Sequence, residues 1–205
     1  MRDVLRHICM SIQGHRGGTM TGSYRIAGVG GQGVITMAKV ISTILMNENL
    51  DPVMSEIHGL SQRGGSVVSD IKYDSAKSPI LTKKDADVLI GMKTSEALSN
   101  MYVLKENGIC VGNRINDPGK DVVIDQVDGR KVYWVDCKSI AGDDSNGSIN
   151  MILLGFISSL DPKIHFNDAM KYVSEAFGGK YTERNTTMLR RGYEAGVRLF
   201  GNSTN

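Results

Sequence analysis

A strand that runs into a glycine-rich turn and then into a helix constrains the fold of this chain more than any other feature. The stretch YRIAGVGGQGV, residues 24–34, joins a short apolar strand to the GxGxxG pattern Gly28-Val-Gly-Gly-Gln-Gly33. The segment after it spaces apolar side chains for one face of a helix: Val34, Met37, Ala38, Ile41, Ile44 and Leu45. Such a unit is typical of proteins in which helices pack in layers on a sheet.

The rest of the chain continues this alternation. Strands are expected at 51–57, 66–73, 86–91, 108–113 and 131–136, the last near a sheet edge, and helices at 94–103, 149–160, 167–177 and 183–200. The sequence therefore predicts a three-layer α/β/α single domain with a mixed, mostly parallel sheet, a Rossmann-like start and a helical C-terminal third.

Composition favours one ordinary globular domain. The 205 residues are 40% hydrophobic and 22% charged. The formal net charge of +2 is carried by residues 1–19, where Arg2, Arg6 and Arg16 face only Asp3, so the remainder is neutral. This balance excludes a broad nucleic-acid surface, and no apolar run approaches the roughly 20 residues of a membrane span. We interpret residues 1–19 as a disordered leader or a start-site artefact, with a targeting segment as the alternative, and residues 20–205 as the domain.

The cysteines argue against an iron–sulfur cluster held by this chain alone. Cys9, Cys110 and Cys137 lie far apart without a CxxC pair, whereas such a cluster takes about four thiolates. The same pattern argues against a disulfide framework and favours a reducing cytoplasm. Cys110 and Cys137 are expected to be buried, inert thiols.

The glycine pattern admits two interpretations. A helix N-terminus behind glycines is suited to a phosphate, and Glu56, 23 residues beyond Gly33, lies where an acid could bind the ribose of NAD. Alternatively, the glycines only permit tight packing of strand and helix, while Gln32 offers its amide to a neighbouring loop.

A second motif, EIHGLSQRGGSVVSD at residues 56–70, surrounds paired glycines with polar side chains. Arg63 could hold a phosphate or carboxylate bidentately, or pair with Glu56. His58 and Arg63 are candidates for a catalytic role. The candidate binding residues of both motifs are Gly28, Gly30, Gly31, Gln32, Gly33, Glu56, Gln62, Arg63, Gly64, Gly65 and Ser66. HExxH, GxSxG and GxxxxGK[ST] patterns are absent, so no self-sufficient catalytic set is recognisable.

Together the two motifs resemble those of a known family. YRIAGVGGQGVITMAKVI followed by SEIHGLSQRGGSVVSDIKY is similar to the gamma-type subunit of 2-oxoacid:ferredoxin oxidoreductases, and most similar to the small (beta) subunit of the indolepyruvate enzymes. ADVLIGMKTSEAL, NMILLG and ERNTTMLRRGYEAG follow in the same order, so the resemblance spans residues 24–196.

The resemblance implies a subunit of an enzyme that oxidatively decarboxylates a 2-oxo acid with coenzyme A, giving an acyl-CoA, CO2 and reduced ferredoxin. Thiamine diphosphate and [4Fe-4S] clusters would reside in a large partner subunit, and ferredoxin would be reached through the complex. This chain would support assembly and coenzyme A access. The HGLSQRGGS form favours indolepyruvate or another aryl-pyruvate, with a pyruvate or 2-oxoglutarate gamma subunit as the alternative.

Hypotheses of different classes remain open. In the first, the glycine turn and the loop face the partner and the coenzyme A entrance, and Arg63→Ala weakens coenzyme A use or assembly. In the second, the chain is a free-standing NAD-binding protein that uses Glu56; a regulatory nucleotide sensor is a third. In the helix at 149–160, Asn150 lies just off the apolar face and is the position we would test.

Overall fold

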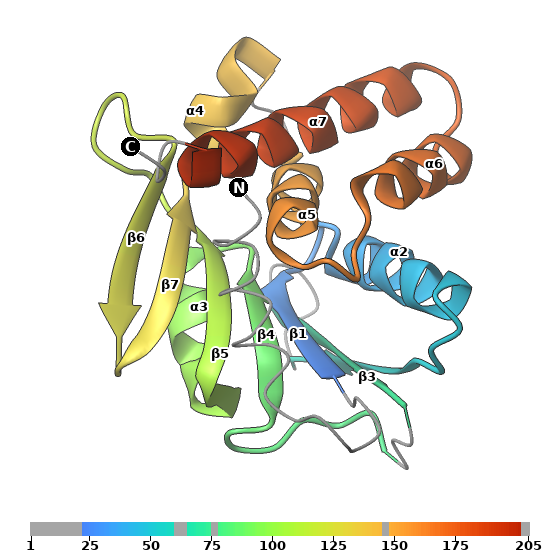
Figure 1. Ribbon diagram of the computed structural model, residues 1–205, viewed down its shortest axis with the longest axis vertical. Helices are drawn as coiled ribbons and strands as arrows, with labels where there is room; N and C mark the ends of the chain where they lie inside the picture. The colour runs from blue at the N-terminus through green and yellow to red at the C-terminus, as the bar shows by residue number, and fades with distance from the viewer. Residues whose placement is uncertain (1–21, 60–64, 75–77, 145–147, 202–205) are drawn as a thin grey trace.

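The computed structural model describes residues 22–59, 65–74, 78–144 and 148–201. Within these residues, seven strands form one sheet in the order β2-β3-β1-β4-β5-β7-β6 (Figure 1). The strands are β1 (Gly22–Val29), β2 (Val53–His58), β3 (Ser66–Tyr73), β4 (Ala86–Gly91), β5 (Leu104–Asn113), β6 (Val122–Val127) and β7 (Arg130–Val135).

The strand directions give a mixed sheet. β1, near its middle, pairs in parallel with β4, and β5 and β7 continue the parallel part. β3 runs antiparallel to both β1 and β2, and β6 runs antiparallel to β7. Five of the seven described strands therefore share one direction, which confirms the expected mixed, mostly parallel sheet.

The Rossmann-like start carries one difference from the dinucleotide-binding pattern. In that pattern the second strand lies directly beside the first. Here β3 lies between β1 and β2, so β2 is two strand spacings from β1, or about 10 Å.

Helices cover both faces of the sheet. They are α2 (Val34–Asn47), α3 (Thr94–Asn100), α4 (Cys137–Ala141), α5 (Ile149–Leu160), α6 (Phe166–Ala176) and α7 (Lys180–Gly201), with short 3-10 turns η1 (Met101–Val103) and η2 (Gly142–Asp144). α3 and η1 pack on one face, and α2, α5, α6 and α7 build the core on the other (Figure 1). The three-layer arrangement and the helical C-terminal third are confirmed.

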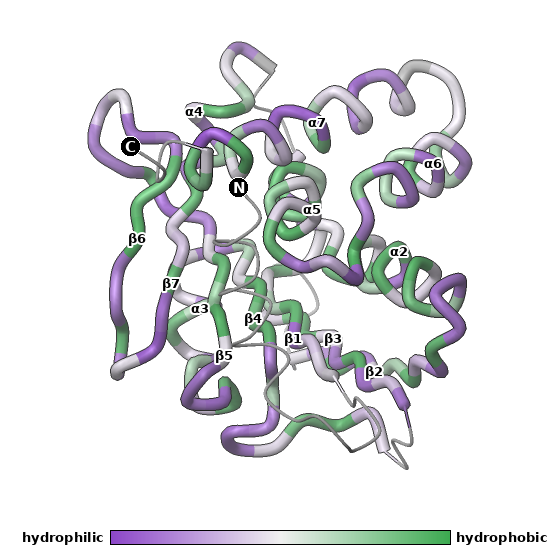
Figure 2. The backbone as a smooth tube through the Cα atoms, viewed as in Figure 1, coloured by the Kyte–Doolittle hydropathy of each residue, from purple (hydrophilic) through white to green (hydrophobic). Residues whose placement is uncertain are grey.

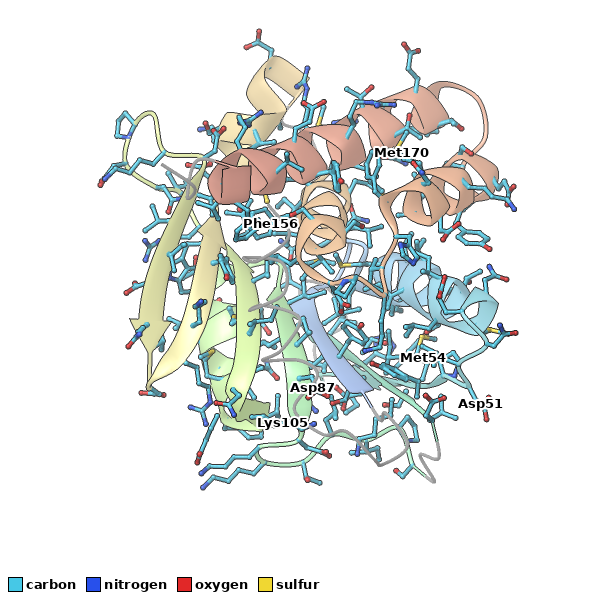
Figure 3. All side chains as sticks on the ribbon, in the orientation of Figure 1. Asp51, Met54, Asp87, Lys105, Phe156 and Met170 are labelled. Atoms are coloured by element: carbon cyan, nitrogen blue, oxygen red, sulfur yellow. The ribbon has the colours of Figure 1, made fainter. Side chains whose placement is uncertain are left out.

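α5 lies between the sheet and α7 and is mostly buried. Nine of its residues are buried, and Figure 2 shows it as mainly hydrophobic, whereas α7 is more hydrophilic. Its Phe156, labelled in Figure 3, packs against Tyr133 of β7 with ring centroids 5.9 Å apart. Glycines let α7 approach closely, because a methyl group at Gly155 or Gly192 would overlap backbone of the facing helix.

A buried ion pair joins β1 to β3, the two strands from which the sequence motifs extend. Arg25 binds Asp70 through two N–H···O contacts of 2.7 Å, and both side chains are almost wholly buried. Further hydrogen bonds reach Asn100, Tyr102 and the Leu81 carbonyl. Arg25 and Asp70 are partners in the pairing of β1 with β3, and Asp70 also accepts from the Leu81 amide, so the buried charges are well compensated.

Two elements were not expected from the sequence. β6 forms the sheet edge beyond β7, and α4 follows β7. β5 also begins at Leu104, four residues before the expected start. Within the described residues, no helix is both long and apolar enough to cross a membrane.

Candidate functional site

The two motifs meet at the carboxyl end of the parallel strands. The helix after β1 lies on one face and the helix after β4 on the other, so the chain diverges between these two strands. Ligands of open α/β sheets bind at such a divergence point. At the amino end of the parallel strands, charged side chains are already paired: Asp87 and Lys105, both labelled in Figure 3, form an ion pair. Its N···O distance is 2.7 Å.

The glycine turn is held by its own hydrogen bonds. Gly31 and Gly33 have φ values of +91° and +82°, which favour glycine. The Val29 amide donates to Gln32 Oε1 at 2.9 Å, and the Gln32 amide donates to the Val29 carbonyl at 3.1 Å. The side-chain oxygen of Gln32 therefore braces its own turn.

The turn is also bonded to the second motif. The Gly30 amide donates to the Gly65 carbonyl at 3.1 Å, and the Gly59 amide donates to the Ser66 carbonyl at 2.8 Å. The Ser66 hydroxyl donates to Glu96 of α3 at 2.7 Å. The structure thus brings Gly65 and Ser66 to the glycine turn. Gln62, Arg63 and Gly64 lie outside the described residues.

Glu56 and His58 lie on β2, two strands away from β1, at the same end of the sheet. His58 Nε2 is 3.6 Å from Glu56 Oε2, and both residues are exposed. With β3 between them and the glycine turn, Glu56 is displaced from the position beside β1 that a ribose-binding acid takes.

Asn150, flagged in the sequence as a position to test, lies at the glycine turn. It is the second residue of α5, and a methyl group at Gly33 would overlap its amide. One site residue was missed: Glu96, which accepts from Ser66. No sequence signal links Glu96 to the turn, because it is distant along the chain.

The two cysteines of the described part are buried, as expected. Burial raises the pKa of the Cys110 thiol to about 12. Burial and the neighbouring Asp136 carboxylate raise the pKa of Cys137 as well. Neither thiol is a ready nucleophile at neutral pH.

This end of the sheet offers hydrogen-bond donors around a backbone turn. Gly30 and Gly31 are exposed, and the first amides of α2 and α5, which lack intrahelical acceptors, lie near the turn. Among the described residues, no group of three or more His, Cys, Asp or Glu side chains is arranged to hold a metal ion. The arrangement suits recognition of an anion or a partner loop.

Comparison with known proteins identifies the family. The model of the family described as pyruvate ferredoxin/flavodoxin oxidoreductase matches residues 23–195. The chain belongs to this family. The resemblance based on the two motifs is thereby confirmed.

Relatives match over nearly their whole length. Indolepyruvate oxidoreductase subunit IorB of Archaeoglobus fulgidus is 28% identical over 193 residues, covering 84% of this chain and 94% of that protein. Pyruvate synthase subunit PorC of Methanothermobacter thermautotrophicus is 25% identical over 177 residues, covering 83% and 93%.

Solved structures share the fold. Pyruvate oxidoreductase subunit PORC of Thermotoga maritima matches with a TM-score of 0.68 at 18% identity, over 85% of this chain and 96% of that one. The 2-oxoglutarate:ferredoxin oxidoreductase of Magnetococcus marinus, solved with 2-oxoglutarate, coenzyme A and succinyl-CoA bound, matches with a TM-score of 0.71 at 22% identity. The match covers 87% of this chain but only 31% of that longer chain.

Proposed function

We propose that this chain is the small, gamma-type subunit of a 2-oxoacid:ferredoxin oxidoreductase. The complex would oxidatively decarboxylate a 2-oxo acid with coenzyme A, forming an acyl-CoA and CO2 and passing the electrons to ferredoxin. The observation that carries the proposal is the hydrogen bond between Gly30 and Gly65, which joins the two family motifs at the carboxyl end of the parallel strands.

In this proposal the chain supplies binding surface, while the partner subunits supply the cofactors. The glycine turn, Ser66 and the loop residues Gln62 and Arg63 would face the coenzyme A entrance and the partner. Thiamine diphosphate would carry the carbanion chemistry, and [4Fe-4S] clusters the electrons, in the partner. Three cysteines in the whole chain are fewer than the four thiolates of such a cluster, which supports this division. Free thiols at Cys110 and Cys137 support a reducing cytoplasm as the location.

We propose indolepyruvate or another aryl-pyruvate as the substrate. The HGLSQRGGS motif supports this choice, as does the likeness to indolepyruvate oxidoreductase subunits in several archaea, among them Archaeoglobus fulgidus. A role as a pyruvate or 2-oxoglutarate gamma subunit is the alternative, supported by the likeness to PorC. Turnover of the three oxo acids by the purified complex decides between them.

Arg63→Ala in the complex tests the coenzyme A role. A charge-assisted hydrogen bond contributes about 1.5–3 kcal/mol, so the KM for coenzyme A should rise roughly 10- to 100-fold. Lys84→Ala is the control, because it also removes one positive charge but lies before β4 at the opposite edge. An intact complex with an unchanged KM for coenzyme A in Arg63→Ala would contradict the proposal.

The competing NAD hypothesis is tested on the isolated chain. A ligand that binds only the folded state raises the melting temperature. We expect no shift with NADH, because Glu56 lies beyond β3 from the glycine turn. A shift with NADH that Glu56→Ala abolishes would favour the NAD-binding protein instead.

A further inference from the structure

We infer that the outer edge of β2 is a self-association surface, at which two copies of this chain pair their β2 strands in antiparallel fashion about a two-fold axis at Ile57. This pairing gives a role to Glu56, Ile57 and His58, which begin the second motif and have none in the proposed function. It does not depend on whether that function is correct.

The backbone of β2 is open on its outer side. β2 is the first strand of the sheet and, among the described strands, pairs only with β3. Residues of an antiparallel pair bond to their neighbour strand alternately. The Gly59 amide bonds to the Ser66 carbonyl, so the backbone of Ile57 also faces β3 and the N–H and C=O groups of Glu56 and His58 face outward. Such an edge is a template for another strand.

The side chains of this edge are complementary to one another. Ile57 is apolar yet 44% exposed. Glu56 and His58 lie together on the other face of the strand, with Nε2 of the imidazole 3.6 Å from a carboxylate oxygen. A carboxylate accepts what an imidazole donates, so one copy offers both halves of a polar pair on either side of an apolar centre.

Two-fold pairing centred on Ile57 matches all three side chains. It sets Ile57 opposite Ile57 of the second copy. On either side of the axis it sets Glu56 opposite His58 of the second copy, and each such pair exchanges both of its N–H···O bonds. Apolar pairs and pairs of opposite charge directly across two strands stabilise a sheet. The partner that this edge fits is therefore a second copy of the chain.

Other registers, and the other edge of the sheet, lack this match. An axis at Glu56 sets two carboxylates opposite each other, which is destabilising. An axis at Ser55 sets each Glu56 opposite the thioether of Met54, which cannot donate to it. In β6, the opposite edge strand, the one charged residue is Asp125, which already lies 3.7 Å from Arg114.

The test is disulfide formation by single cysteines in the full chain as purified from its own cells, with Cys9 replaced by serine. Cys110 and Cys137 are buried and do not compete. Facing residues of a pair without mutual backbone bonds have Cα atoms about 4.5 Å apart, within the range that a disulfide spans. Ile57→Cys should therefore form a covalent dimer of this chain under mild oxidation.

Two variants serve as controls. Val53→Cys lies on the same strand and the same face as Ile57, but the two copies of Val53 are about 27 Å apart in this register, at about 3.4 Å per residue. Ile124→Cys lies on the edge strand β6 and is 52% exposed, so it measures random collision. Neither should form more than roughly a tenth as much dimer as Ile57→Cys.

Exchange of the charged pair tests the same register independently. Added to Ile57→Cys, His58→Glu sets two carboxylates opposite each other and should lower the yield of dimer at least tenfold. Adding Glu56→His to that variant restores unlike pairs and should return the yield to within about threefold. A loss caused by misfolding of β2 would not be restored by the second substitution.

Three results would overturn the inference. The first is a dimer yield for Ile57→Cys no higher than for Ile124→Cys or Val53→Cys. The second is a disulfide from Ile57→Cys to a different polypeptide, which would show that the edge serves another partner. The third is a charge exchange that fails to restore the dimer lost in His58→Glu.

Discussion

Gly33 meets two separate demands in one residue. Its φ of +82° lies in the left-handed region, and the Asn150 amide occupies the space of a side chain. Gly31 meets only the first demand, because its φ is +91° but no atom of the described residues lies within 4 Å of its missing side chain. Comparing substitutions at Gly31 and Gly33 therefore distinguishes the effect of backbone strain from the effect of close packing.

Gly33→Ala should therefore destabilise the fold more than Gly31→Ala. The left-handed backbone costs a non-glycine residue about 1–2 kcal/mol, and overlap with Asn150 adds roughly 1–3 kcal/mol in the first variant. Urea unfolding of both variants measures the difference. An equal loss of unfolding free energy in the two variants would mean that Asn150 of α5 does not pack tightly against the turn.

Tyr24 links stability to alkaline pH. Its hydroxyl donates to Asp161 at 2.6 Å, and burial, followed by the Asp161 charge, raises its pKa well above the ordinary value of 10.0. The folded protein keeps this proton above pH 10, whereas the unfolded chain loses it. Unfolding then releases a proton, so stability falls as pH rises above 10.

We expect Tyr24→Phe to reduce that dependence. The slope of unfolding free energy against pH above 10 should become shallower by up to about 1.4 kcal/mol per pH unit, one proton's worth. At pH 7 the variant should lose about 1–3 kcal/mol, because Asp161 loses a buried donor. Denaturant titrations at pH 7 to 11 give both quantities, and an unchanged alkaline slope would contradict the assignment.

At the scale of elements, the sequence predicts the buried strands and long helices because their apolar spacing is strong. It does not predict β6, whose VVIDQV segment has no buried residue and lacks a clean alternation, or α4, whose five residues are too short for a helical period. The insertion of β3 between β1 and β2 is equally hidden, because strand pairing depends on partners distant in sequence. For the same reason Asn150 could be singled out, but not placed beside Gly33.

The contact between α5 and α7 holds the helix that carries Asn150. A substitution at Gly155 tests how much this contact contributes to stability. A methyl group there would overlap the Leu189 carbonyl, so Gly155→Ala should lose about 1–3 kcal/mol despite the better helix propensity of alanine. Gly178→Ala is the control and should change little, because no described atom lies within 4 Å of the position that its methyl group would take. Chemical unfolding compares them, and equal stability would show that the helices can separate without penalty.

At the scale of the whole molecule, the two faces of the sheet differ. Among the described elements, α3 and η1 pack on one face, where Leu98 and Tyr102 are exposed, while α2, α5, α6 and α7 pack on the other. Ile80, in the segment before β4, is exposed as well. The family match covers residues 23–195, and the relatives IorB and PorC are named as subunits. These features suit a domain that works inside a larger assembly.

The most direct test of that claim is anaerobic affinity purification of this chain from its own cells. We expect a large partner subunit containing thiamine diphosphate and iron, and a complex that reduces ferredoxin with indolepyruvate only when coenzyme A is present. Recovery of the chain alone, carrying a nicotinamide nucleotide and lacking that activity, would contradict the account.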